Sequence, residues 1–172
     1  QLSGVKQQVL GLGIDNFQYS ADRFRNKYRI EKPFILYAGR KDHGKKVDIL
    51  LEYYSRYIQK NTDKLVLVMI GGGRIDVPSD LKNHVYDLGY VDEQDKYDAY
   101  AAAAILCNPS PHESFSIVIM ESWYAGTPVL VNEHCQVTRR FCELSNGGLY
   151  YSNYDEFAAC LELIIDNIPF AE

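Results

Sequence analysis

The sequence lacks the apolar run of about 20 residues that a membrane-spanning helix needs, and it does not begin with the pattern of a signal peptide. Its four cysteines form no CxxC pair, and they have no metal-ligand spacing with the four histidines. These features argue against a disulfide-stabilised secreted domain and against a zinc site. We therefore expect a reduced protein of the cytoplasm.

Positive charge is also scarce, because 18 Lys and Arg residues face 23 Asp and Glu residues, a net charge of −5. This balance argues against nucleic acid as a partner, although it leaves room for a local basic pocket. Hydrophobic residues, in contrast, occupy 47% of the 172 positions, which is enough for one globular domain with a buried core.

Short apolar runs alternate with helical patterns from residue 34 onward. The runs predict six strands, at 34–39, 65–73, 84–91, 105–110, 127–132 and 148–151. Helical periodicity predicts helices at 47–60, 92–104 and 155–168, and one more after the fourth strand. Continuous apolarity indicates strands that are buried on both faces. The pattern predicts an α/β fold with a Rossmann-like, doubly wound parallel sheet of about six strands. We expect residues 1–30 to be a lead-in segment and residues 31–172 to form the domain.

Ligands bind at the carboxyl ends of the strands in such a sheet, so the residues that follow each strand are the candidates for a site. Gly39 and Arg40 follow the first strand, and Lys45 and Lys46 come shortly after. A glycine lets the chain turn, and an arginine and a lysine can converge on a phosphate. The alternative is a solvated loop with ordinary surface charge.

A run of three glycines, residues 71–73, follows the second strand. A dinucleotide fingerprint needs GxGxxG opening a helix, but Asp76 stands at the third glycine position and Pro78 follows. The run therefore favours a tight turn that a ligand or a neighbouring domain approaches closely. A nicotinamide-binding oxidoreductase domain stays as an alternative.

The stretch PHESFSIVIMESW (111–123) follows the fourth strand and carries Glu113 and Glu121. Ser114 or Ser116 can cap the helix expected there, which leaves free N–H groups near its start for a phosphate. The two glutamates can face one cleft at different depths, but spacing alone favours the alternative of a capping residue and an exposed helix residue. After the fifth strand come His134 and Cys135, but adjacent side chains point apart and no third group orients them as a nucleophile pair.

In order along the chain, the segments GR…K, LVLVMIGGG, LGYV, NPSPHESFSIVIMES and GTPVLV resemble the C-terminal, donor-binding domain of a GT-B glycosyltransferase. The resemblance is to retaining glycosyltransferase family 4 and covers about residues 30–168. Glu113 and Glu121 match the ends of that family's E-x7-E motif. It implies one half of a GT-B fold, transferring a hexose from a UDP- or GDP-sugar to a saccharide or lipid-linked acceptor.

The resemblance also implies roles for single residues. Arg40 and Lys45 would hold the diphosphate and stabilise the charge that develops as it leaves, without a metal. Glu113 would bind hydroxyls of the donor sugar. Glu121 would bind the ribose, and the backbone near Tyr90 and Val91 would contact the base. The other donor-binding positions would be Gly39, Gly72, Ser114, Phe115, Ser116 and Ile117.

The sequence departs from the family in two places. Ser114 and Ser116 replace both glycines of the usual E-G-F-G, and residues 133–135 replace a pair of glycines after the fifth strand. The resemblance further implies a partner, the N-terminal acceptor-binding domain of the same protein, through which membrane contact would occur. The isolated chain is expected to bind a nucleotide-sugar and to transfer nothing. A non-catalytic binding module of the same fold is the first alternative.

Overall fold

The computed structural model describes residues 13–61 and 64–167. Six strands form one sheet: β1 Phe34–Ala38, β2 Val66–Ile70, β3 Val85–Gly89, β4 Ile105–Asn108, β5 Val129–Asn132 and β6 Gly148–Tyr151. The strand order is β3-β2-β1-β4-β5-β6, and every neighbouring pair is parallel. The predicted six-stranded parallel sheet is confirmed. Its order reverses between β1 and β4, which is where a doubly wound sheet offers a ligand crevice.

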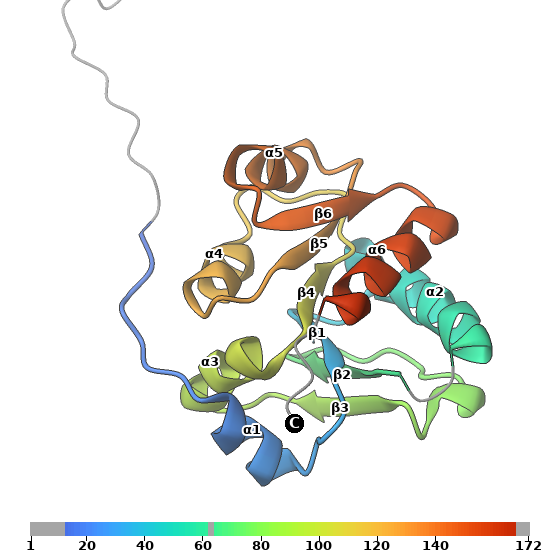
Figure 1. Ribbon diagram of the computed structural model, residues 1–172, viewed down its shortest axis with the longest axis horizontal. Coiled ribbons are helices and arrows are strands. Elements are labelled where there is room, and N and C mark those ends of the chain that lie inside the picture. The colour runs from blue at the N-terminus through green and yellow to red at the C-terminus, as the bar shows by residue number, and fades with distance from the viewer. Residues whose placement is uncertain (1–12, 62–63, 168–172) are drawn as a thin grey trace, which may run out of the picture.

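Helices cover both faces of the sheet (Figure 1). α2 and α6 pack on one face, and α1, α3 and α4 pack on the other. The helices are α1 Ala21–Tyr28, α2 Val47–Lys60, α3 Glu93–Ala102, α4 Ile117–Tyr124, α5 Gln136–Ser145 and α6 Tyr154–Asp166, with 3₁₀ turns η1 His43–Lys45 and η2 Ser79–Leu81. The doubly wound arrangement follows from the sequence as expected.

Strand β1 shows why the apolar runs are continuous. Ile35 and Tyr37 face the core under α2 and α6, whereas Phe34 and Leu36 face the core under α1 and α3. All four side chains are buried. Burial of each such side chain stabilises the fold by about 1.5–3 kcal/mol, so neither face of the strand tolerates polar residues.

Helix α2 has the predicted bounds, and its predicted apolar face is buried: Val47, Leu50, Leu51, Tyr54, Tyr57 and Ile58. Other elements are shorter than expected. The glycines after the second strand lie beyond the end of β2, and α3 begins after Asp92, whose side chain makes no capping hydrogen bond. The last residue of the predicted closing helix, residue 168, lies outside the described residues.

Two helices differ from expectation. Helix α5 is not predicted, because it is short and polar on average, and its buried positions, Thr138 and Cys142, are not strongly apolar. Helix α1 lies inside the expected lead-in, whose residues 1–12 are outside the described part. α1 is capped by Ser20, and its Phe24 is buried in the same core cluster as Phe34. The segment from Ser20 onward therefore packs on the domain that follows it.

Candidate functional site

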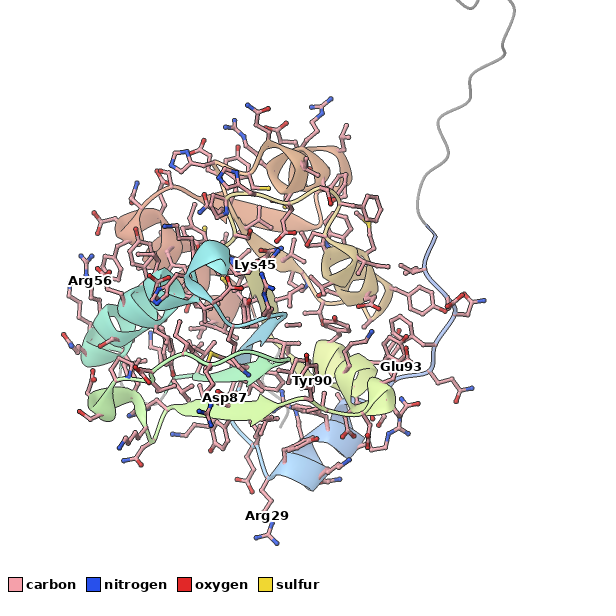
Figure 2. All side chains as sticks on the ribbon, turned by 180° about the vertical axis from the view of Figure 1, so that it is seen from behind. Arg29, Lys45, Arg56, Asp87, Tyr90 and Glu93 are labelled. Carbon is pink, nitrogen blue, oxygen red and sulfur yellow. The ribbon has the colours of Figure 1, made fainter. Side chains whose placement is uncertain are left out.

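The first site feature is an ion pair across the point where the strand order reverses. Lys45 lies in η1 after β1, and Glu113 lies in the loop after β4. The Nζ of Lys45 donates to Oε1 of Glu113 at 2.7 Å, and the Glu113 side chain is 13% exposed. Lys45 is labelled in Figure 2, toward the upper part of the view, with Asp87 and Tyr90 below it. Two of the three predicted catalytic residues are thus in direct contact.

The third, Arg40, is 75% exposed and points away from the core. Its Nε donates to Oδ2 of Asp42 at 2.6 Å, while Oδ1 of Asp42 accepts from the backbone N–H of Lys45 at 2.9 Å. The hydrogen bond from Lys45, reinforced by Arg40, lowers the pKa of the Asp42 carboxyl. Asp42 therefore links the two predicted phosphate-binding residues through one ionised carboxylate.

A cavity of about 470 Å³ opens beside Arg40, at the carboxyl ends of β1, β2 and β3. Five of the residues predicted for donor binding line it: Gly39, Arg40, Gly72, Tyr90 and Val91. Tyr90 is 88% exposed, and its hydroxyl lies where a Cβ on Gly72 would come within 2.4 Å of it. The predicted base-contacting positions consequently share one cavity with Arg40, whereas Lys45, Ser116 and Ile117 do not line it.

The glycine run 71–73 forms a tight turn, but the group that approaches it is the protein's own backbone. A Cβ on Gly71 would lie 2.2 Å from the carbonyl oxygen of Gly39, and Gly71 has a φ of +113°. The run leads into a loop and then η2, not into an α-helix. The dinucleotide arrangement that the oxidoreductase alternative requires is absent from this described segment.

Lys41 is a site residue that the sequence analysis does not single out. It is 2% exposed, and its Nζ donates to the carbonyl oxygen of Gly71 at 2.6 Å and to Oδ1 of Asp87 at 2.7 Å. Its backbone N–H donates to the carbonyl of Gly72 at 2.7 Å. One buried ammonium therefore joins the ends of β1, β2 and β3 under the cavity. The only available sequence signal is alternation, since position 41 has the same parity as the buried Ile35 and Tyr37.

Glu121 lies on α4 and is 7% exposed, so it is not the exposed helix glutamate that spacing alone allowed. Its Oε1 accepts from Nζ of Lys96 at 2.8 Å, and its Oε2 accepts from the hydroxyl of Tyr100 at 2.9 Å. Burial, together with the nearby Glu121 charge, raises the pKa of Tyr100. Both donors come from α3, four residues apart on one helix face. Neither is predicted from sequence, because their partner lies on a different helix.

Ser116 is the N-cap residue of α4, but its hydroxyl does not cap the helix. The Ser116 Oγ instead accepts from Nδ2 of Asn108 at 2.8 Å. Its φ is +64°, a left-handed conformation that suits the glycine usual at this position and costs a serine about 1 kcal/mol. The expectation of a side-chain cap from Ser116 is wrong, and no side chain caps the first turn of α4.

The other predicted residues around this turn lie in different surroundings. Glu113 and Ser114 line a second cavity of about 530 Å³ together with His134 and Cys135. The Phe115 ring packs edge-on against Phe141 of α5, with centroids 5.6 Å apart. Ile117 is exposed at the start of α4, and Cys135 is buried while His134 is exposed. The difference in exposure between Cys135 and His134 agrees with the expectation that adjacent side chains point apart.

Within residues 13–61 and 64–167, no group of three or more His, Cys, Asp or Glu side chains could hold a metal ion. No helix in the same residues is both long enough and apolar enough to cross a membrane.

Comparison with known proteins gives a consistent result. A family model described as glycosyl transferases group 1 matches residues 19–172. The uncharacterized glycosyltransferase MJ1607 of Methanocaldococcus jannaschii is 28% identical over 183 residues, which cover 97% of this chain and 47% of the relative. The phosphatidyl-myo-inositol mannosyltransferase of Mycobacterium tuberculosis is 32% identical over 129 residues, which cover 72% of this chain and 33% of the relative.

Solved structures with the same fold include WaaG, a glycosyltransferase involved in lipopolysaccharide biosynthesis. It superposes with a TM-score of 0.72 at 19% identity, over 88% of this chain and 43% of WaaG. Anabaena HepE, solved with UDP and glucose, superposes with a TM-score of 0.72 at 18% identity, over 86% of this chain and 42% of HepE. This chain spans less than half the length of each of these four proteins.

Proposed function

This chain belongs to the glycosyl transferases group 1 family, and on that premise we propose that it is the donor-binding half of a retaining glycosyltransferase. The transferred group is a hexose, carried by UDP or GDP, and the acceptor is a saccharide or a lipid-linked saccharide. Support comes from the Rossmann-like fold shared with WaaG and HepE and from the complex of HepE with UDP and glucose.

The observation that carries the proposal is the 2.7 Å contact between Lys45 and Glu113. A cation from the β1 loop and a carboxylate from the β4 loop meet over the crevice at which the strand order reverses. A nucleotide-sugar bound there has its diphosphate beside the ammonium and its sugar hydroxyls beside the carboxylate. The ion pair holds both groups in place before the ligand arrives.

Catalysis in this arrangement is electrostatic. As the bond between sugar and diphosphate breaks, negative charge grows on the leaving phosphate. In the proposed step, Lys45, the exposed guanidinium of Arg40 and the first-turn N–H groups of α4 stabilise that charge. Glu113 binds donor-sugar hydroxyls near the reacting carbon. These groups carry the proposed step without a metal ion.

The nucleoside occupies the cavity beside Arg40. The base lies against the backbone near Tyr90 and Val91, and the ribose lies toward Glu121. Acceptor binding belongs to a second, N-terminal domain of the same protein, as expected from relatives more than twice as long as this chain. We therefore expect the 172-residue chain to bind nucleotide and to transfer nothing, and measurable transfer by it alone would contradict this division. Its location in the cytoplasm, with any membrane contact made through the second domain, stays a prediction.

Calorimetric titration of the chain with UDP, GDP and NADH tests the proposal. We expect heat from at least one nucleoside diphosphate and none from NADH. Heat from NADH with none from UDP or GDP would overturn the proposed function in favour of a nicotinamide-binding domain.

A further inference from the structure

Lys96 stands between Glu121 and the nucleotide cavity. Its side chain lines the 470 Å³ cavity together with Arg40 and Tyr100. Glu121 instead borders a smaller cavity of about 150 Å³ on the side of residues 13–17. A ligand in the larger cavity therefore contacts the ammonium of Lys96 before it reaches the carboxylate of Glu121.

The position of this ammonium is fixed from two sides. It donates to Oε1 of Glu121 at 2.8 Å, and it lies 4.5 Å from the centroid of the Tyr97 ring. The hydrogen bond to Glu121 uses one of the three N–H groups of a lysine. The Lys96 side chain is 29% exposed, so the ammonium is neither sealed in the core nor free in solvent.

The pair offers a hydrogen-bond donor directly beside an acceptor. A hydroxyl group both donates and accepts, so two vicinal hydroxyls match such a pair better than they match a carboxylate alone. Ionised partners also make hydrogen bonds about twice as strong as neutral partners do. The ribose of a nucleotide carries vicinal hydroxyls at its 2′ and 3′ positions.

We propose that Lys96 is a ribose-binding residue, and that the Lys96–Glu121 pair, not Glu121 alone, recognises the 2′,3′-diol. This inference rests on the proposed function. Lys96 donates to one hydroxyl oxygen, Glu121 accepts from a hydroxyl hydrogen, and Tyr100 donates to the second carboxylate oxygen. A cation in this cavity has one competing role, contact with the diphosphate next to Arg40, and the experiment below separates the two roles.

The first arm of the test compares UDP with 2′,3′-dideoxy-UDP by calorimetry, or the GDP pair if GDP binds more tightly. For the unmodified chain we expect the dideoxy analogue to bind at least about tenfold more weakly, the size of one charge-assisted hydrogen bond. Lys96→Met is expected to weaken UDP by a similar factor and the dideoxy analogue by less than about twofold. Equal weakening of both ligands by Lys96→Met would show that Lys96 does not recognise the ribose.

The second arm compares uridine, UMP and UDP. If Lys96 contacts the ribose, Lys96→Met weakens all three by the same factor. A loss that grows with each added phosphate would assign Lys96 to the diphosphate and overturn the inference. If the unmodified chain binds neither UDP nor GDP, the proposed function fails, and this inference fails with it.

Three further variants guard against a purely structural effect. Lys96→Met leaves the buried Glu121 without its cation, so the double variant Lys96→Met/Glu121→Gln removes both charges together. In a double-mutant cycle we expect the losses in UDP affinity to be non-additive, whereas additive losses would argue against a shared ligand contact. Lys96→Arg keeps the charge and is expected to keep discrimination against the dideoxy analogue. Lys64→Met breaks another lysine–glutamate pair, with Glu162 at 3.1 Å outside this cavity, and should leave every affinity unchanged.

Discussion

Glu113 and Glu121 each pair with a lysine, but in different settings. Lys45–Glu113 and Lys96–Glu121 have nearly equal N–O distances, 2.7 and 2.8 Å. The first pair joins two loops over the crevice, and the second joins two helices and has a buried tyrosine on the far carboxylate oxygen. Glu113 is therefore held by one partner from a loop, while Glu121 is part of the framework that joins α3 and α4.

The two ion pairs are exposed to similar extents, with side chains 34% and 13% exposed at Lys45–Glu113 and 29% and 9% exposed at Lys96–Glu121. The energetic difference therefore comes from the buried Tyr100 hydroxyl, which donates to Glu121. Separating two charges that can reach water costs little, because water replaces the lost partner. Removing one member of a buried, hydrogen-bonded set leaves the others without partners and costs several kcal/mol. The two glutamates should therefore differ in how much they contribute to stability, even where both contribute to binding.

The largest expected effect is on folding, at the Glu121 end. Glu121→Ala leaves the Lys96 ammonium and the buried Tyr100 hydroxyl without their acceptor, and we expect the free energy of unfolding to fall by about 3 kcal/mol. Glu113→Ala should lower it by less than about 1 kcal/mol, since Lys45 can reach water. Urea unfolding of both variants measures the difference, and equal losses would break the comparison.

Arg40→Ala tests the Glu113 end through binding. The exposed guanidinium contributes little to the fold, but we expect the variant to lose about 2 kcal/mol of UDP affinity, roughly thirtyfold, because a charge-assisted contact to phosphate is lost. Uridine should bind as before, and calorimetry with both ligands checks this. Equal losses for uridine and UDP would remove Arg40 from the phosphate. Glu121→Gln gives the complementary result, weakening uridine and UDP alike.

Tyr100→Phe sharpens the description of the Glu121 end. The variant keeps the ring and removes one hydrogen bond to a buried carboxylate, so we expect a loss of about 1.5 kcal/mol in unfolding free energy. Tyr97→Phe is the matched control, because its hydroxyl donates to Glu93 at the surface. We expect less than about 0.5 kcal/mol from the control. A control as costly as Tyr100→Phe would show that burial of Glu121 is not what matters.

The smallest effect concerns Ser116, which lies between the two glutamates. Its left-handed backbone favours glycine, so Ser116→Gly should be more stable than Ser116→Ala by about 1 kcal/mol, although both lose the bond to Asn108. The same pair of substitutions at Ser114, which does not have a positive φ, should show no such preference for glycine. Thermal unfolding of the four variants is the measurement.

The sequence predicts the fold where a periodic signal exists. Strands β1 and β2 are unbroken apolar runs and α2 shows a clear helical stripe, so these elements are predicted at the right places. Helix α5 is shorter than α2 and polar on average, and residues 136–145 receive no prediction.

At the site, local motifs place Arg40, Lys45 and Glu113 at strand ends, because position along the chain decides which edge of the sheet a residue occupies. The partners of Glu121 are not predictable in this way. Lys96 and Tyr100 lie more than 20 residues earlier, on a helix whose contact with α4 is set by packing. Lys41 is missed for a related reason, since the alternation of buried positions along β1 is a weak signal for a lysine that lies beyond the end of the strand.

Lys41 has a consequence for motion as well as for position. Its ammonium and its backbone N–H bond to the chain after β2, at the carbonyls of Gly71 and Gly72. The ammonium also donates to Asp87 of β3, and the N–H of Gly71 donates to the carbonyl of Gly89 at the end of β3. We therefore expect these three strand ends, which are distant in sequence, to open as one cooperative unit. In hydrogen exchange, the amides of Lys41 and Gly71 should share one opening free energy. A substitution at Asp87, on the edge strand, should then loosen the floor of the cavity beside Arg40.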